Sequence, residues 1–157
     1  MNFDEIYQDI ILDHCRAPRN FGPMDDADIT TEGENPTCGD EIKLQLKVRA
    51  DEIEDARFTG QGCAICMASA SLMTRTVKKH STTFAQKVFE QFHGAIGGQT
   101  ENLDALGDLA ALAGVQQFPQ RVKCAMLPWE TLRVALTQHA SIAVDHSLNH
   151  DFSNRGK

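Results

Sequence analysis

Cysteine and carboxylate side chains carry most of the chemistry that this sequence could perform. Cys38 and Asp40 stand two positions apart within the stretch Asn35 to Glu41, separated by one glycine and preceded by Pro36. A short run with proline and glycine is a poor helix or strand and a good loop. Thiolates and carboxylates both bind Zn²⁺. The stretch therefore predicts a loop that holds a metal ion.

Two further cysteines could complete such a site from distant parts of the chain. Cys63 and Cys124 lie in separate segments, and three thiols with one carboxylate make a tetrahedral ligand set. That set alone does not choose between Zn²⁺ and an iron–sulfur cluster. The alternative is that these are buried apolar cysteines, which are common in protein cores. For Cys38, the neighbouring Gly39 and Asp40 favour the metal site.

Length and charge limit the classes of function. The chain has 157 residues, a formal net charge of −7, an apolar fraction of 41% and five cysteines. That length suits one domain with its own core. The negative charge argues against nucleic acid or an anionic membrane as a partner, because both attract surplus Lys and Arg. The acidic amino terminus is unlike a signal peptide, and no apolar run approaches the roughly 18 residues of a membrane span. We expect a cytoplasmic protein whose cysteines are reduced and act as metal, redox or nucleophilic groups.

The first half of the chain predicts a helix followed by a small sheet. Apolar residues at helical spacing place an amphipathic helix at residues 3–16, and a loop with one short strand near 29–32 follows. Strict alternation predicts a half-buried strand at 42–48, and a second strand follows at 53–59. Strands so close in sequence pair most simply as an antiparallel hairpin.

The second half predicts helices. They are expected at residues 64–79, 84–92 with Ser81 or Thr82 as the N-cap, 103–113, and 121–139, where Pro128 should start, kink or restart the helix. The order indicates an α+β fold, a small antiparallel sheet with helices packed on one side. We assign residues 1–140 to a single domain and 141–157 to a loosely ordered tail.

Several motifs, in the right order, resemble the U-type iron–sulfur assembly proteins, the family of IscU, SufU and the amino-terminal domain of NifU. These motifs are Ile10–His14, Pro18–Gly22, Asn35–Asp40, Gly60–Ile65 and Arg121–Cys124. The long stretch between Cys63 and Cys124 resembles the SufU branch, which carries an insertion that we expect at residues 84–115. Lys123, where IscU-like proteins have a His, favours the same branch.

The resemblance implies an α+β fold of the SufE/NifU type and a Zn²⁺ ion bound by Cys38, Asp40, Cys63 and Cys124. It also implies a sulfur carrier, rather than a stand-alone enzyme. Cys38 would accept persulfide sulfur from a pyridoxal-phosphate-dependent cysteine desulfurase of the SufS type, for downstream iron–sulfur assembly machinery. Arg121 would be an auxiliary residue that orients a ligand or stabilises the freed thiolate, although an exposed Arg is equally able to make a surface ion pair.

Two other functions fit the same residues. One is a scaffold on which a transient iron–sulfur cluster is assembled and then transferred. The other is a purely structural zinc module, which the carboxylate ligand and its glycine neighbour disfavour.

Cys15 and Cys66 lie outside the family pattern. Cys66 forms a C-x-x-C with Cys63 at a helix start, but no βαβ pattern frames it as a redox motif. The remaining interpretations of Cys66 are an ordinary helix residue, an oxidation-sensitive neighbour or a spare ligand. Cys15 is expected to be a packing residue and not a ligand.

Overall fold

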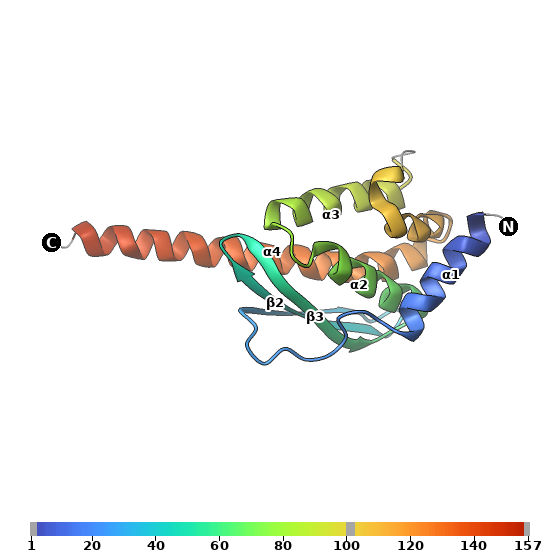
Figure 1. Ribbon diagram of the computed structural model, residues 1–157, viewed down its shortest axis with the longest axis horizontal. Coiled ribbons are helices and arrows are strands. Elements are labelled where there is room, and N and C mark those ends of the chain that lie inside the picture. Colours follow the sequence, from blue (N-terminus) through green and yellow to red (C-terminus); the bar gives the residue numbers. More distant parts are fainter. Residues whose placement is uncertain (1–2, 100–102, 156–157) are drawn as a thin grey trace.

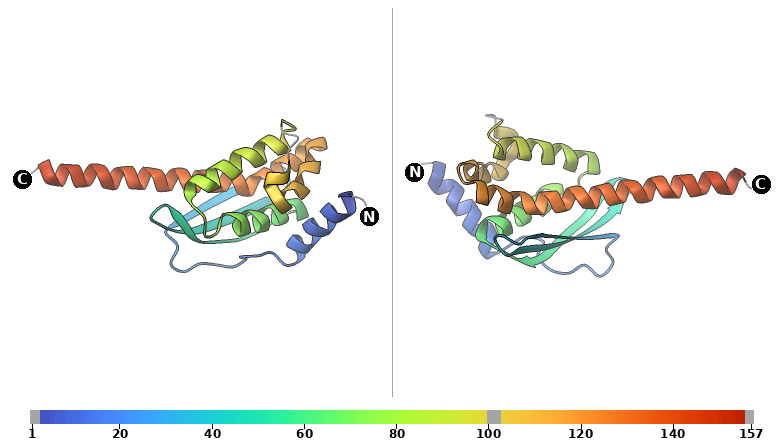
Figure 2. Two further views of the ribbon diagram at one scale, coloured as in Figure 1. Left: turned by 45° about the horizontal axis from the view of Figure 1, so that its top comes forward. Right: turned by 180° about the vertical axis from the view of Figure 1, so that it is seen from behind.

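A three-stranded antiparallel sheet lies beneath a set of helices in the computed structural model (Figure 1). The structure describes the backbone of residues 3–99 and 103–155, and the side chains of residues 7–99 and 103–140. The strands β1 (Ile29–Asn35), β2 (Asp40–Arg49) and β3 (Glu52–Gln61) follow the order β1-β2-β3. Figure 2 shows the helices on the same side of the sheet from two further directions. The predicted α+β fold is confirmed.

Alternating burial along β2 explains why this segment is a strand with one face in the core. Ile42, Leu44 and Leu46 are buried, whereas Glu41 and Lys43 between them are exposed. The predicted hairpin of β2 and β3 is confirmed. The short strand expected near residues 29–32 runs on to residue 35, because β2 offers partners along that whole length.

The helices largely follow their predicted positions. They are α1 (Phe3–Arg16), α2 (Ala64–Val77), α3 (Thr82–Ile96), the 3₁₀ segment η1 (Asp104–Gln117) and α4 (Pro119–Arg155). Of the two candidate caps for α3, Ser81 is the one used, since its side chain accepts a hydrogen bond from the N–H of Phe84 at 3.0 Å.

The last helix differs most from its expected bounds. It begins at Pro119, where the missing N–H of proline costs no helical hydrogen bond, and it continues through Pro128 instead of starting or restarting there. Its backbone extends to Arg155. Side chains after residue 140 lie outside the described part, so the loosely ordered tail stays a prediction. No helix in the described part is both long and apolar enough to cross a membrane.

The expected insertion, residues 84–115, contains most of α3 and η1. These elements form an outer layer, with α2 and α4 between them and the sheet (Figure 1). Phe92 of α3 packs against Trp129 of α4 with ring centroids 4.9 Å apart, and both side chains are fully buried. The insertion therefore extends the hydrophobic core as a second layer.

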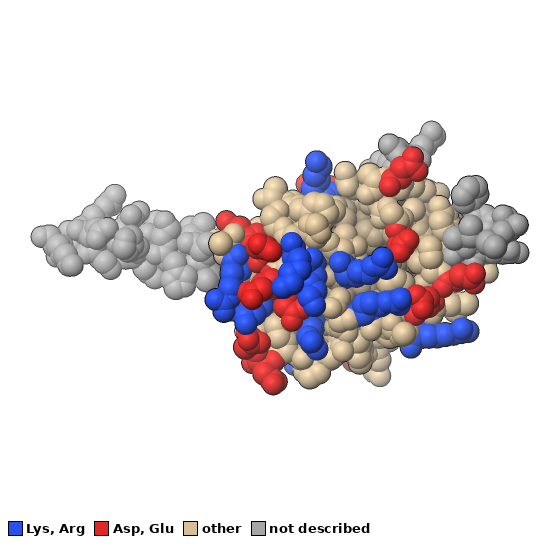
Figure 3. Space-filling view, viewed as in Figure 1, with Lys and Arg blue, Asp and Glu red and all other residues tan. Residues whose placement is uncertain are grey.

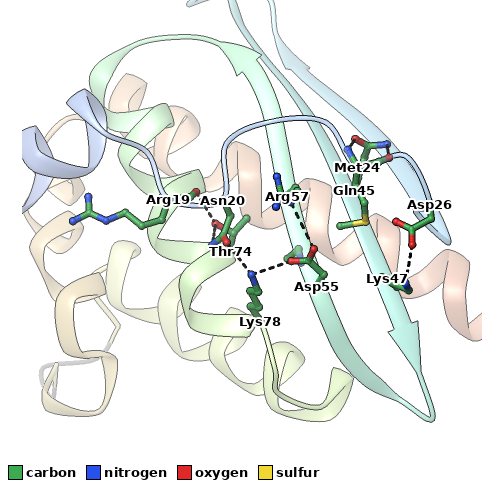
Figure 4. Close-up of polar contacts among 11 residues, drawn as sticks. Arg19, Asn20, Met24, Asp26, Gln45, Lys47, Asp55, Arg57, Thr74 and Lys78 are labelled. Atoms are coloured by element: carbon green, nitrogen blue, oxygen red, sulfur yellow. Dashed lines mark hydrogen bonds and ion pairs between the residues drawn. The ribbon is translucent and has the colours of Figure 1, made fainter.

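A strap formed by residues 17–28 pairs with the free edge of β3 at residues 20–22 and then crosses to β2. The N–H of Gly22 donates to the carbonyl of Phe58, and the N–H of Phe58 donates to the carbonyl of Asn20. Figure 4 shows the side chains that hold this strap, including the contacts of Asn20 with Thr74 and of Asp26 with Lys47. Pairing of this kind blunts an edge that would otherwise be open to another strand.

Many basic side chains gather on the face that carries the strap (Figure 3). Several are matched by acids: Lys47 pairs with Asp26 at 2.7 Å, and Lys78 pairs with Asp55 at 3.1 Å. Partly exposed pairs of this type each contribute less than about 1 kcal/mol. The first joins the strap to β2, and the second joins the end of α2 to β3.

A buried histidine holds α1 against α2. His14 is 2% exposed, and its Nδ1 lies 2.7 Å from the Ser71 hydroxyl oxygen, while its Nε2 lies 3.4 Å from a guanidinium nitrogen of Arg75. Because a guanidinium can only donate, Nε2 is the acceptor and Nδ1 carries the proton. Burial lowers the pKa of His14, and the charges of Arg19 and Arg75 lower it further, against Asp13 and Asp108. The folded protein therefore favours the neutral imidazole.

Acidification should weaken this contact. The unfolded imidazole titrates near pH 6.5 and the folded one lower, so the unfolded state binds more protons as the pH falls below about 6.5. We expect the wild type to exceed His14→Gln in free energy of unfolding by roughly 1–3 kcal/mol near pH 8, and this advantage to shrink near pH 5. Urea unfolding at both pH values measures it. His80→Gln, at an exposed histidine, is the control, and an advantage independent of pH would contradict the neutral imidazole.

The contact between β1 and α4 depends on a glycine. A Cβ at Gly33 would collide with the hydroxyl of Thr131 and lie 3.3 Å from a methyl of Leu127. We expect Gly33→Ala to lower the free energy of unfolding by roughly 1–3 kcal/mol through overpacking. Gly114→Ala is the matched control, because a Cβ there meets nothing within 4 Å. Urea unfolding of the two variants compares them, and equal stabilities would refute the close approach.

Candidate metal centre

Three potential ligands from different elements meet at one end of the sheet. Cys38 lies in the loop between β1 and β2, Asp40 begins β2, and Cys124 lies near the start of α4. One donor atom from each falls within 4.8 Å of the others. Bonds of about 2.0–2.3 Å to a tetrahedral ion would space its donors by roughly 3–4 Å. Small side-chain movements would therefore suffice for all three to bind one metal ion.

The loop presents Cys38 to the outside. The carbonyl of Asn35 accepts hydrogen bonds from the N–H of Cys38 at 3.2 Å and of Gly39 at 2.9 Å. Gly39 has a φ of 73°, a conformation that favours glycine, and a Cβ there would meet nothing within 4 Å. Cys38 is exposed, in contrast to the buried Asp40 and Cys124. The loop is thus anchored at its base and open around its thiol.

Asp40 supplies the clearest sign that a cation belongs here. Its side chain is 1% exposed; Oδ1 accepts a hydrogen bond from the N–H of Cys63 at 2.8 Å, whereas Oδ2 is buried without a hydrogen-bond partner among the described residues. A buried carboxylate oxygen is costly unless a donor or a cation satisfies it. Two neighbouring thiols and this oxygen suit Zn²⁺ or iron, so the residues present fit a bound metal.

Cys63, the fourth predicted ligand, is adjacent but is not one of these three converging donors. Its Sγ caps α2 by accepting a hydrogen bond from the N–H of Cys66 at 3.4 Å, and its own N–H holds Asp40. A sulfur that accepts such a hydrogen bond is still able to bind a metal, because hydrogen bonds to metal-bound sulfurs are common. The ligand roles of all four residues remain a prediction, to which the structure adds the proximity of three side chains and of the Cys63 backbone.

Charge and burial distinguish the thiols. Burial raises the pKa of the Cys124 thiol, and the neighbouring side chains of Asp40, Cys38 and Cys63 raise it further. A bound cation would displace the proton of such a thiol, which couples metal binding to proton release. Negative charge at Cys63 raises the pKa of Arg121, as does its contact with Cys124. The predicted auxiliary Arg121 therefore lies beside two of the thiols.

Two features of the centre were not predicted from the sequence. Gly62 borders Asp40 so closely that a Cβ would lie 2.7 Å from Oδ1, whereas the sequence named this glycine only as part of the motif Gly60–Ile65. Cys66 is fully buried behind Cys63, and negative charge at Asp40, Cys63 and Cys38 adds to burial in raising its pKa. The C-x-x-C spacing was the one sequence signal for it. Cys15, half-buried on α1, is not among the three converging donors.

Comparison with known proteins gives consistent matches along most of the chain. A family model described as the NifU-like N terminal domain matches residues 6–142. The chain is 44% identical over 133 residues to the zinc-dependent sulfurtransferase SufU of Bacillus subtilis (strain 168), covering 83% of this chain and 89% of that protein. It is 37% identical over 139 residues to the iron–sulfur cluster assembly scaffold protein IscU of Streptococcus pyogenes serotype M1, covering 88% and 87%.

A solved structure supports the same fold. The crystal structure of a candidate iron–sulfur cluster assembly scaffold protein for the SUF system, from Fervidobacterium islandicum AW-1, matches with a TM-score of 0.79 at 32% identity. The match covers 86% of this chain and 99% of that one. The sheet, the helices that flank it and the segments carrying the thiols therefore have a counterpart in an experimental structure.

Gly62→Ala should weaken metal binding without removing a ligand. The added Cβ would displace Asp40 and its hydrogen bond with Cys63, and such supporting contacts are worth about tenfold to 100-fold in metal affinity. We expect a loss of Zn²⁺ affinity in that range, measured by competition with a chromophoric chelator. Gly114→Ala is the control. Unchanged affinity in a correctly folded Gly62→Ala protein would contradict the role given to Asp40.

Proposed function

This chain belongs to the family of NifU-like N-terminal domains, and we propose that it serves iron–sulfur cluster assembly by accepting sulfur at Cys38. The observation that carries the proposal is the asymmetry of the thiols. Cys38 is exposed on an open loop, whereas Cys124 is buried. A macromolecular sulfur donor can reach the first and not the second. The Bacillus relative, a zinc-dependent sulfurtransferase, supports the assignment.

Cys38, Asp40, Cys63 and Cys124 would hold the metal, for which we propose Zn²⁺. When bound, Zn²⁺ keeps its thiol ligands deprotonated at neutral pH and restrains their nucleophilicity. Cys63 would bind through the sulfur that also caps α2, while Asp40 would contribute the oxygen that has no hydrogen-bond partner among the described residues. The chain then has a ready thiolate at its surface and three further ligands beneath it.

In the transfer, one sulfur–sulfur bond breaks on the donor and another forms on Cys38. We propose that the donor is a persulfide on a pyridoxal-phosphate-dependent cysteine desulfurase. The Cys38 thiolate attacks the outer sulfur of that persulfide, a new sulfur–sulfur bond forms at Cys38, and the cysteine of the desulfurase leaves as a thiolate. Gly39 lets the loop turn Cys38 toward the donor. Arg121, beside the centre, would stabilise negative charge on the thiolates.

The sulfur held on Cys38 would pass to downstream assembly machinery, so the chain acts as a carrier and does not turn over alone. A scaffold for an iron–sulfur cluster is the second candidate, because the Streptococcus relative is named as one and the same four residues would hold the cluster. Anaerobic incubation with iron and sulfide separates the two functions. A stable, transferable cluster that forms without prior removal of zinc would favour the scaffold.

Cys38→Ala should abolish sulfur acceptance. After incubation with a cysteine desulfurase and cysteine, we expect mass spectrometry to show one added sulfur atom on the wild type and none on Cys38→Ala, together with loss of the stimulation of the desulfurase. Cys15→Ala, at a half-buried thiol on α1, is the matched control and should retain both properties. Full stimulation by Cys38→Ala would refute Cys38 as the acceptor.

A further inference from the structure

We propose that Asn35 is a positioning residue of the metal centre, whose side-chain amide donates a hydrogen bond to the carboxylate of Asp40 when the metal ion is bound. The inference rests on the metal centre of the proposed function, and it does not depend on sulfur acceptance by Cys38. Asn35 is not itself a ligand. Its amide would hold the one oxygen ligand of the centre in the orientation that binds the ion.

Strand pairing places Asn35 beside Asp40. Asn35 is the last residue of β1, and its partner across the sheet is Asp40, the first residue of β2. Side chains of directly paired residues in antiparallel strands point to the same face, with Cβ atoms about 4.5–5.5 Å apart. Here that face is the buried one, since Asn35 is 9% exposed and Asp40 is 1% exposed. The amide and the carboxylate are therefore neighbours inside the protein.

Each of the two side chains has an unmet hydrogen-bonding group. Nδ2 of Asn35 and Oδ2 of Asp40 are both buried without a hydrogen-bond partner among the described residues. The amide nitrogen can only donate, and an ionised carboxylate can only accept. A buried polar atom without a partner is costly. The two open groups are thus complementary, and a carboxylate oxygen that accepts one hydrogen bond still has a lone pair for a cation.

A bound ion supplies the reason for the two groups to meet. The Asp40 carboxylate is already held on one side, where Oδ1 accepts the N–H of Cys63 at 2.8 Å. A metal ion bound together with Cys38 and Cys124 would fix the plane of this carboxylate. The terminal torsion of an asparagine side chain is broad, so the Asn35 amide can turn toward the fixed oxygen with little strain. Hydrogen bonds to a charged acceptor are the stronger kind.

The backbone of Asn35 has a separate task. Its carbonyl accepts the N–H groups of Cys38 at 3.2 Å and of Gly39 at 2.9 Å, and so anchors the loop that presents the exposed thiol. Substitution of the side chain leaves this carbonyl in place. A variant at Asn35 therefore changes the support of Asp40 while it keeps the anchor of the loop, and the two tasks can be measured apart.

The simpler interpretation is that water satisfies the amide. Asn35 also borders a cleft that His93, Lys123 and Glu130 help to line, and a water molecule there could accept the N–H. In that case the amide has no effect on the metal. Packing is the other simple role. Leucine is close to asparagine in size and has no donor, so Asn35→Leu preserves the packing and removes the hydrogen bond, whereas Asn35→Ala removes both.

Competition between the protein and a chromophoric chelator for Zn²⁺ tests the proposal. We expect Asn35→Leu and Asn35→Ala each to lose about tenfold to 100-fold in affinity. Glu34→Gln, at the exposed neighbour on the same strand, is the matched control and should bind as the wild type does. Asp40→Ala retains the three thiols. In that background, adding Asn35→Leu should cost less than about twofold, because the acceptor of the hydrogen bond is already gone.

Nuclear magnetic resonance of the isotope-labelled, zinc-loaded protein observes the amide directly. We expect one Nδ2–H signal of Asn35 to be displaced in the wild type and to return toward the position of a free amide in Asp40→Ala. This measurement needs no variant at Asn35, so it decides the matter even where Asn35→Leu and Asn35→Ala do not fold.

Wild-type affinity in a folded Asn35→Leu protein, or an equal loss with and without Asp40, would overturn the positioning role. An amide signal that is the same in the wild type and in Asp40→Ala would overturn it as well. A wild type that binds no zinc would overturn the metal centre together with this inference. Full stimulation of the desulfurase by Cys38→Ala would refute only the acceptor, and a loss of zinc affinity in Asn35→Leu would then still support the role of Asn35.

Discussion

The hydrogen bond from the backbone of Cys63 to the carboxylate of Asp40 is the contact on which this end of the molecule depends. It joins the first residue of β2 to the cap of α2 over 2.8 Å, and the Asp40 side chain is buried there. A carboxylate buried in this way is costly unless both of its oxygens are satisfied. One oxygen has the N–H of Cys63, and the other faces thiols. The buried carboxylate therefore favours a bound cation at the place where the side chains of Cys38 and Cys124 approach it.

Strand pairing places that contact. Asn35 pairs with Asp40 across β1 and β2, and Glu41 pairs with Gln61 across β2 and β3, so three strand ends meet beside the centre. Gly60 has a φ of 144°, and a Cβ there would collide with the carbonyl of Glu41. Glycine at this point lets the last residues of β3 lie close against β2, where Gly60 pairs with Ile42. A shift in register by one residue would move Asp40 to the solvent face.

The sequence predicted the elements of this structure well because burial patterns are local. Alternation in β2 and the serine cap of α3 are readable within a few residues. Strand ends depend on partners, which is why β1 runs longer than its own composition indicated. The path of α4 through Pro128 could not be foreseen, because a proline inside a helix removes one hydrogen bond and crowds the preceding turn, whereas the burial of Trp129 and Leu132 just after it is a tertiary effect.

The resemblance predicts four metal ligands, and the structure brings donor atoms of three of them together, Cys38, Asp40 and Cys124. The sulfur of Cys63, the fourth, accepts a hydrogen bond from the N–H of Cys66, a contact that the sequence pattern did not indicate. The closeness of Gly62 to Asp40 likewise comes from tertiary contact. The sequence indicated Cys66 only through its C-x-x-C spacing, and its full burial in the hydrophobic core likewise comes from tertiary packing.

Unequal attachment of the thiols explains how one ligand could leave without disturbing the others. The helices that carry Cys63 and Cys124 are joined by a hydrogen bond from the Ser69 hydroxyl to the carbonyl of Ala125 at 2.6 Å, inside the core. The loop of Cys38 is held by two backbone hydrogen bonds to Asn35. Moving that loop requires only local rearrangement, whereas moving Cys124 would require α4 to shift against the sheet. The exposed thiol is therefore the one that the fold leaves free to exchange.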